Sequence, residues 1–197
     1  CAGCAAPGRP LCAACRAALV PRPRRRELDG LTVWSGLDYR DVAAGALRAL
    51  KEQGRTGLAR ELAPALHASL RAVAAGESGL VVVPVPTSRA AMRRRGYRVV
   101  DLLVRRTGLR PATLLAPARR TADQRALGRE ERASNAAGSL VARRATGLRV
   151  VIADDVVTSG ATLREAARAL SAAGAHVVGA ATVAATPLRA TPRRNGA

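Results

Sequence analysis

The sequence predicts an α/β fold with a mostly parallel β-sheet. Three apolar runs, over residues 80–85, 148–153 and 175–184, show little alternation and are typical of strands buried on both faces. Helical patterns separate these runs, and the alternation of buried strand and helix favours parallel pairing. The 197 residues are enough for one such domain and a small additional segment.

Amphipathic patterns predict the helices of this domain. Apolar side chains recur at helical spacing over residues 41–52, 58–75, 89–106 and 161–173. Pro64 is expected to kink the second helix or to begin a new first turn. Residues 113–115 predict a further short strand, and the polar, Arg-rich residues 116–139 predict a long loop of the kind that is functional or mobile in compact domains.

Composition sets the expected domain boundaries. Residues 1–20 hold all four cysteines, and residues 21–27 combine proline with arginine, which blocks a helix and keeps a segment solvated. We therefore expect a small cysteine segment, a Pro/Arg linker, a main domain over residues 28–185 and a flexible tail over residues 186–197.

The net charge of +19 favours anionic partners. The chain has 33 Lys and Arg against 14 Asp and Glu, and Lys51 is its only lysine. Phosphorylated small molecules, nucleic acid or an acidic protein would suit this excess, and an ordinary solvated surface explains it equally well. Only Trp34, Tyr39 and Tyr97 could stack on bases, which argues against stacking as the main mode of nucleic-acid binding.

The sequence also gives expectations about location. No run reaches the roughly 18 apolar residues of a membrane span, so no membrane insertion is expected. The start of the chain lacks the charged and apolar regions of a signal peptide, and a cytoplasmic, reducing location is the default expectation. Because the chain begins at Cys1 rather than Met, leading residues are expected to be missing, and a removed signal stays an alternative.

The cysteines predict a metal site. Cys1, Cys4, Cys12 and Cys15 have the spacing C-x2-C-x7-C-x2-C. Two C-x-x-C pairs can supply four thiolates to one tetrahedral Zn²⁺, and the short spacing favours a structural site over a catalytic one. Two disulfides in an oxidising compartment, or a redox-active C-x-x-C, are the alternatives.

The most informative segment is residues 150–162. A buried strand leads into Asp154 and Asp155, then into a turn over residues 158–162 and a helix. The turn places N–H groups and hydroxyls at a helix N-terminus, where an anion is stabilised, and Gly160 lets the backbone come close. Carboxylates at a strand's carboxyl end can accept hydrogen bonds from sugar hydroxyls or help to hold hydrated Mg²⁺. A capped helix after ordinary turn residues is the alternative.

This run resembles the binding motif of type I phosphoribosyltransferases, and it predicts their fold for the main domain. The resemblance implies that Asp154 and Asp155 bind the ribose 2′ and 3′ hydroxyls. It implies that the 5′-phosphate is bound by Thr158, Ser159, Gly160, Ala161 and Thr162. The ligand would be phosphoribosyl pyrophosphate with Mg²⁺, or a related phosphorylated compound. Purine-salvage members often carry Asp where this chain has Thr158, which argues against standard hypoxanthine or guanine salvage.

A strand that ends in alternating prolines provides a second motif. Such a strand cannot continue its ladder and must open into a loop, and arginines just beyond it can hold a pyrophosphate. The predicted pyrophosphate loop comprises Pro84, Val85, Pro86, Thr87, Arg89 and Arg95. A basic helix face is the alternative for any single arginine.

Together with the cysteines and a third motif, these segments resemble the ComF family, which is linked to natural competence and DNA uptake. The third motif lies in the long loop and contains Thr121, Gln124, Leu127, Arg132, Asn135, Gly138 and Leu140. Two positions depart from the family, because Arg98 replaces a usual Asn and Leu140 replaces a usual aromatic residue.

If the protein is an enzyme, the resemblance implies substitution at the anomeric carbon, with Mg²⁺ assisting the departure of pyrophosphate. The expected catalytic residues are Asp154, Asp155 and Arg132, with Arg132 stabilising the leaving pyrophosphate. Gln124 or Asn135 would orient a ligand as the long loop closes.

Three functions stay open from the sequence. The first is a phosphoribosyltransferase with an unidentified acceptor. The second is a non-catalytic accessory protein that binds single-stranded DNA alongside DNA-uptake proteins, which the basic charge favours. The third is a regulator that senses phosphoribosyl pyrophosphate without turnover. Proteins of this fold often dimerise, so a homodimer is a further expectation.

Overall fold

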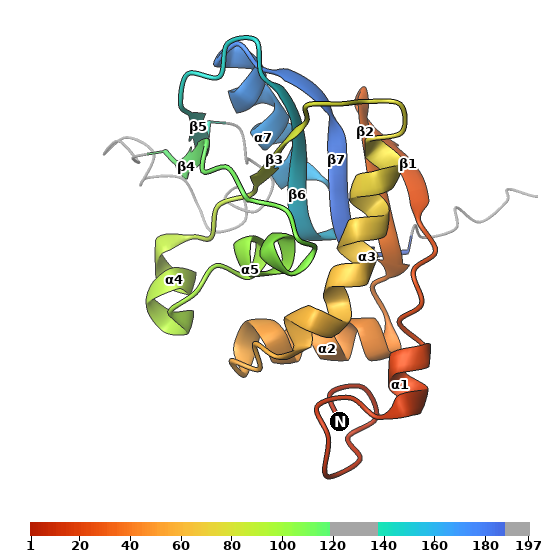
Figure 1. Cartoon of the computed structure of the whole chain (residues 1–197). Helices are drawn as coiled ribbons and strands as arrows, with labels where there is room; N and C mark the ends of the chain where they lie inside the picture. The colour runs from red at the N-terminus through yellow and green to blue at the C-terminus, as the bar shows by residue number, and fades with distance from the viewer. Residues whose placement is uncertain (119–137, 188–197) are drawn as a thin grey trace, which may run out of the picture.

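The computed structural model describes residues 1–118 and 138–187, with a five-stranded sheet at its centre (Figure 1). Its strands, in the order β1-β2-β7-β6-β3, are β1 (Arg24–Leu28), β2 (Leu31–Asp38), β7 (His176–Ala185), β6 (Arg149–Val157) and β3 (Val81–Pro84). The pairs β2–β7, β7–β6 and β6–β3 are parallel, and only β1 runs antiparallel, at the edge. The predicted α/β fold with a mostly parallel sheet is confirmed.

Helices cover both faces of this sheet. One face shares a core with α1 (Ala13–Ala17), α2 (Asp41–Glu52), α3 (Leu58–Val73) and α5 (Val99–Arg106), while α7 (Ala161–Ala172) packs on the other. Val151 and Ala153 of β6 belong to the first core, and Val150 and Ile152 belong to the second. This division explains the uninterrupted apolar run, since residues 150–153 are each buried on one face of the sheet or the other.

No helix in residues 1–118 and 138–187 is long and apolar enough to span a membrane.

A second, two-stranded sheet pairs β4 (Leu115–Pro117) antiparallel with β5 (Leu140–Ala142). The short strand predicted over residues 113–115 thus begins two residues later, at Leu115. Leu115 and Leu140 are buried and pack in the same core as α7. This sheet thus joins the two ends of residues 119–137 to the main domain.

One helical prediction needs correction, and one alternative for another is excluded. The single helix expected over residues 89–106 is two helices, α4 (Arg89–Arg95) and α5, because Gly96 adopts a left-handed conformation (φ 77°) that ends α4. Pro64 lies inside α3 rather than at a new first turn.

The predicted Pro/Arg linker is wrong for residues 24–27, which belong to β1. The arginines are tolerated because β1 is an edge strand whose side chains are mostly exposed, and edges commonly carry charge. The prolines at 21 and 23 lie just before the strand, where a missing N–H is not needed. The neighbouring strand β2 was also not predicted.

The cysteine segment packs directly on the main domain. Leu11, Cys15 and Leu19 are buried in the same core as α2 and α3. Gly45 of α2 permits this approach, because a Cβ at that position would collide with the carbonyl oxygen of Ala2. The first 20 residues are therefore fixed to α2 rather than attached by a free linker.

Candidate functional site

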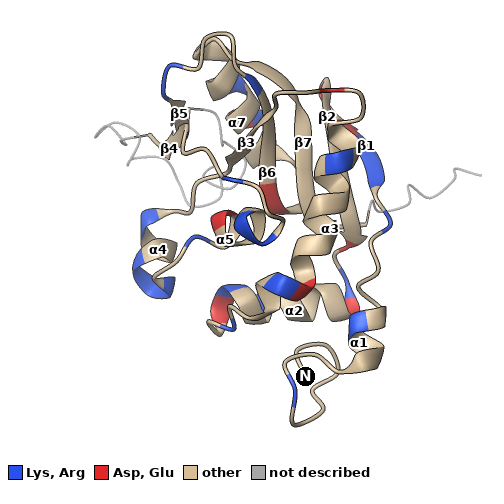
Figure 2. Ribbon diagram, in the orientation of Figure 1, with Lys and Arg blue, Asp and Glu red and all other residues tan. Residues whose placement is uncertain are grey.

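Two adjacent carboxylates lie at the carboxyl end of β6, where Figure 2 shows an acidic segment inside the parallel sheet. The N–H of Asp155 donates to Oδ1 of Asp154 at 2.8 Å. Oδ1 of Asp155 lies 2.9 Å from Nζ of Lys51, which comes from the last turn of α2. Desolvation, followed by the negative charge of Asp155, raises the pKa of Asp154 to about 8. Burial thus disfavours the charged form of Asp154, and the ammonium group of Lys51 offsets negative charge at the pair.

The loop after β3 forms a pocket of about 250 Å³ with these carboxylates. Strand pairing brings the loop here, because β3 lies beside β6 and the N–H of Val85 donates to Ala153 O at 2.8 Å. The pocket is lined by Lys51, Val85, Pro86, Thr87, Ser88, Ala91, Arg95, Val99, Val100, Asp154 and Asp155.

Four of the predicted pyrophosphate-loop residues line this pocket, namely Val85, Pro86, Thr87 and Arg95. Pro84 is instead buried as the last residue of β3, and Arg89 is exposed and does not line the pocket. The Nε atom of Arg95 is buried and has no hydrogen-bond partner among the described residues. An unpartnered buried donor is costly, so an anionic ligand in this pocket would supply the missing acceptor.

The turn over residues 158–162 joins β6 to α7. Thr158, Ser159 and Thr162 are exposed there, at the N-terminus of a 12-residue helix. Gly160 has a φ of 78°, and a Cβ at this position would collide with the side chain of Leu28. The turn therefore requires glycine for its conformation, and the Leu28 side chain would also have to move to admit a Cβ.

Arg26 of β1 supports this turn from behind. Its Nη1 donates to Thr158 O at 3.2 Å, and its Nη2 donates to Thr186 O at 2.7 Å. Its positive charge therefore lies next to the turn on which a phosphate is expected. The sequence analysis placed Arg26 in a linker. Its contact with the turn became visible only when the structure showed that residues 24–28 form strand β1 and pair with β2.

Gln124, Arg132 and Asn135, which were expected to contact a ligand from the long loop, lie outside the described residues.

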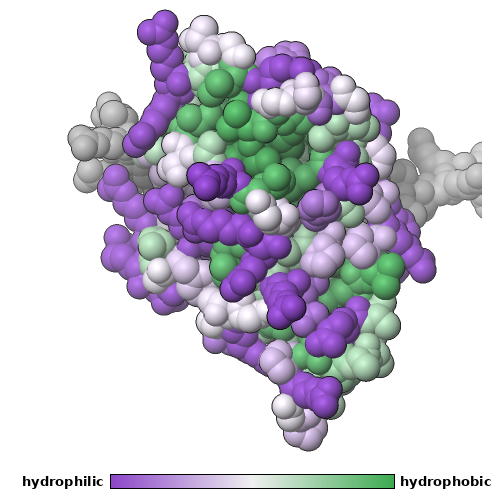
Figure 3. Space-filling view, viewed as in Figure 1, coloured by the Kyte–Doolittle hydropathy of each residue, from purple (hydrophilic) through white to green (hydrophobic). Residues whose placement is uncertain are grey.

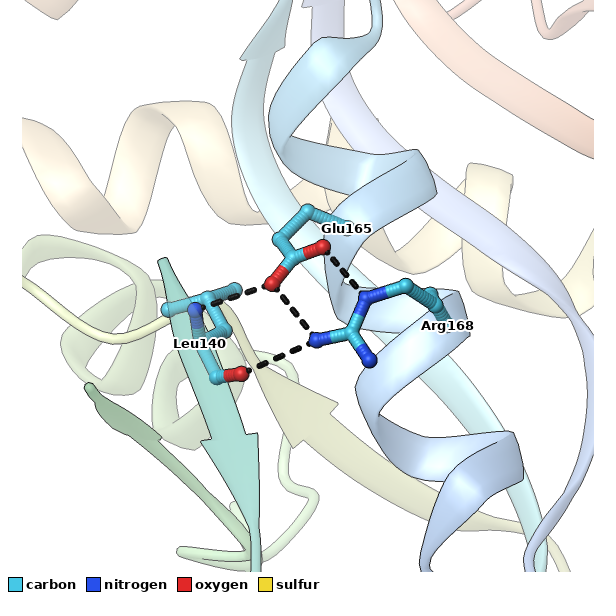
Figure 4. Close-up of polar contacts among 3 residues, drawn as sticks. All are labelled: Leu140, Glu165 and Arg168. Carbon is cyan, nitrogen blue, oxygen red and sulfur yellow. Dashed lines mark hydrogen bonds and ion pairs between the residues drawn. The ribbon is translucent and has the colours of Figure 1, made fainter. Parts of the chain in front are cut away.

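A buried carboxylate fixes β5 to α7 (Figure 4). Glu165 is 4% exposed, and its Oε1 accepts the N–H of Leu140 at 3.0 Å. Arg168 donates to both oxygens of Glu165, at 2.7 and 2.8 Å, and to Leu140 O at 3.3 Å. The helix that begins at the turn thus also anchors the strand that follows residue 137.

We expect Glu165→Ala to lower the free energy of unfolding by about 2 kcal/mol, because it leaves the buried N–H of Leu140 without an acceptor. Arg164→Ala is the control, because it removes an arginine of the same helix whose ion-pair partner Asp29 is 80% exposed, and it should cost under about 1 kcal/mol. Urea denaturation measures both, and equal losses would contradict the role of the buried acceptor.

The wild-type stabilisation from Glu165 should also depend on pH. The hydrogen bond from Arg168 is the largest cause that lowers the pKa of Glu165 below its ordinary value of 4.5. The contribution is therefore full above that value and is lost as the pH falls through the lowered pKa.

The four cysteines converge as their spacing predicts. Their Sγ atoms all lie within 4.8 Å of one another, and none is in a disulfide. Tetrahedral Zn²⁺ with Zn–S bonds of about 2.3 Å needs sulfurs about 3.8 Å apart. The Cys4 and Cys12 sulfurs are 3.8 Å apart, and the N–H of Cys12 donates to Cys1 Sγ at 3.4 Å.

The electrostatics of the cluster also suit a metal. Desolvation raises the pKa of the Cys15 thiol to about 11, so a bound cation would be needed to keep it ionised at neutral pH. These four residues could therefore form a structural zinc site.

One of three comparisons with known proteins identifies the family of this chain. The family model of the phosphoribosyl transferase domain matches residues 90–197, which is more than half of the chain. A search of the curated proteins gives no match. A solved structure of the allosteric regulatory enzyme of purine biosynthesis is 21% identical, with a TM-score of 0.36, over 86% of this chain and 30% of that one. The chain thus spans less than a third of that structure.

Proposed function

Because this chain belongs to the phosphoribosyl transferase domain family, we propose that it binds phosphoribosyl pyrophosphate, or a close relative, at the carboxyl end of β6. One observation carries this proposal. Asp154 and Asp155 lie between two features suited to anions, which are the turn over residues 158–162 and the pocket that contains Arg95.

Each part of the ligand has a matching set of groups. The carboxylates of Asp154 and Asp155 would face the ribose hydroxyls. The 5′-phosphate would bind at the turn, where the N–H groups and dipole of α7 favour negative charge. The diphosphate at C1 would enter the pocket, where Thr87 offers a hydroxyl and Arg95 offers a donor that has no partner within residues 1–118 and 138–187.

The corresponding reaction is transfer of the phosphoribosyl group. The bond between C1 and the pyrophosphate oxygen breaks, pyrophosphate leaves with the electron pair, and an acceptor nucleophile bonds to C1 and gives up its proton. Binding at both ends would hold the ribose in one orientation relative to the acceptor.

Mg²⁺, the ion expected with such a ligand, has no direct protein cage among these residues. Asp155 is already paired with Lys51, and the desolvation that raises the pKa of Asp154 disfavours its charged form. Mg²⁺ prefers several charged or carbonyl oxygens and retains water, so an ion here would be held by the pyrophosphate itself.

The proposal is tested by isothermal calorimetry with phosphoribosyl pyrophosphate. Asp155→Asn is expected to weaken binding by about 10- to 100-fold, because it removes a charged acceptor from the ribose. Glu77→Gln makes the same charge change at the opposite end of β6, where Glu77 pairs with Arg149, and should leave affinity unchanged. Folded wild-type protein that does not bind would overturn the proposal.

A second candidate is an accessory protein that binds single-stranded DNA during uptake, which the resemblance to the ComF family implies. The basic helix α4 favours it, because Arg93 and Arg94 are exposed beside the pocket. Figure 2 shows this basic helix, and Figure 3 shows hydrophilic side chains across the middle of the same face, below an apolar area. DNA affinity that falls steeply with salt would support this candidate, whereas pyrophosphate release would support the transferase.

Ligand binding without pyrophosphate release, under any acceptor tried, would favour the third candidate, a sensor of phosphoribosyl pyrophosphate.

A further inference from the structure

Lys51 reaches the candidate site from a part of the chain that the family match does not include. It lies in the last turn of α2, whereas the match covers residues 90–197. The hydroxyl of Tyr97 donates to Leu50 O and so holds the end of α2 against the connection between α4 and α5. The backbone from which Lys51 extends is therefore held in place, and the contact with Asp155 positions its ammonium group.

The pair of Lys51 with Asp155 is partly shielded from solvent. Their side chains are 26% and 13% exposed, and Nζ to Oδ1 is 2.9 Å. An ammonium group has three donors, so one N–H directed at Asp155 leaves two for other acceptors. Since Lys51 also lines the pocket with Arg95, those donors are available to a ligand there.

The position of Lys51 beside Asp155 would reduce the repulsion between this carboxylate and an anionic ligand. A carboxylate that binds ribose lies close to the anionic diphosphate at C1 of the same ligand, and like charges at that distance repel. A cation placed between them removes the repulsion. Lys51 already holds that place beside Asp155.

We propose that Lys51 is a specificity-determining residue whose ammonium group bridges Asp155 and a diphosphate oxygen at C1 of the ligand. The site then selects a ribose that carries both a 5′-phosphate and a C1 diphosphate over ribose 5-phosphate. This inference rests on the proposed function, because it assumes that the ribose binds at Asp154 and Asp155. It differs from a purely structural role, in which Lys51 would only hold Asp155 in place.

The test compares two ligands that differ only at C1. Binding of phosphoribosyl pyrophosphate and of ribose 5-phosphate is measured by calorimetry at one fixed Mg²⁺ concentration. Lys51→Met keeps the length of the side chain and removes its charge. Arg48→Met is the matched control, because it removes one positive charge from the exposed side of the same helix. Lys51→Arg tests whether charge alone restores selectivity.

We expect Lys51→Met to weaken binding of phosphoribosyl pyrophosphate by about 10- to 100-fold, and that of ribose 5-phosphate by less than about threefold. Arg48→Met should change neither affinity, and Lys51→Arg should restore part of the difference. An equal loss for both ligands, or no loss for either, in a Lys51→Met variant with a wild-type melting temperature would overturn the inference and leave the proposed function standing. Failure of the wild type to bind phosphoribosyl pyrophosphate would overturn both.

Discussion

Removal of metal from the cysteine cluster is expected to lower the thermal unfolding midpoint of this protein by about 10 °C or more. Residues 1–20 contain one helix of only five residues, so this segment has little regular structure of its own to hold it together. Yet it contributes Leu11 and Leu19, which are 2% and 5% exposed, to the main core. Loss of two buried leucines costs about 4 kcal/mol or more, and each kcal/mol lowers the midpoint by roughly 2–4 °C in a protein of this size.

The measurement compares zinc-loaded protein with protein dialysed against a chelator, with metal content determined on both. Cys4→Ser is the sharpest variant, because Cys4 is exposed and its replacement removes a ligand without disturbing the core. Ala6→Ser, at an exposed neighbouring position, is the control and should melt like the wild type. Re-addition of Zn²⁺ should restore the chelated wild type but not Cys4→Ser. Purified protein without metal that melts unchanged would show that packing alone holds the segment.

The sequence was most informative where structure is local. Strands β3, β6 and β7 were predicted because most of their residues are buried on one face or the other, which produces long apolar runs. The turn and the two aspartates follow β6 directly, so their proximity needs no knowledge of the rest of the fold. The cysteines likewise converge within 15 residues of chain.

What the sequence could not show are contacts between distant segments. Lys51 pairs with Asp155 across about a hundred residues, and Arg26 reaches Thr158 across 132. Neither has a local pattern that distinguishes it from a solvated basic residue. Two signals were available for Lys51: it is the only lysine in a chain that otherwise uses arginine, and the Leu50–Lys51 pair near Gly54 is part of the resemblance to the ComF family.

Strand β2 was missed for a related reason. Ser35 and Gly36 interrupt its apolar character, and both are buried. Ser35 hydrogen-bonds Thr182 of β7 at 2.7 Å, and Ser69 of α3 donates to Thr182 O at 2.9 Å. Small and hydroxyl-bearing residues are therefore present because α3 lies unusually close to the sheet. The small and polar residues that allow α3 to pack closely on β2 interrupt the apolar pattern, and the sequence therefore does not predict a strand there.

That close approach predicts a large effect at Gly36. A Cβ there would lie 2.8 Å from the carbonyl carbon and 2.9 Å from the Cα of Ala65, so the clash is with helix backbone and no side-chain rotation relieves it. We expect Gly36→Ala to destabilise the protein by about 3 kcal/mol and to lower the thermal midpoint by roughly 6–12 °C, because α3 must move away from β2 and from the polar contacts beneath it.

Gly57→Ala provides the matched control for this substitution. Gly57 precedes α3 with a φ of −57°, and a Cβ there would have no atom within 4 Å. Its replacement should leave the midpoint unchanged or raise it slightly, because alanine restricts the unfolded chain. Calorimetric scans give the thermal midpoints of both variants. Their difference separates the effect of replacing a glycine from the effect of disturbing the contact between α3 and β2. Equal midpoints for Gly36→Ala and Gly57→Ala would show that α3 can shift from β2 at little cost, so that its close packing does not stabilise the sheet.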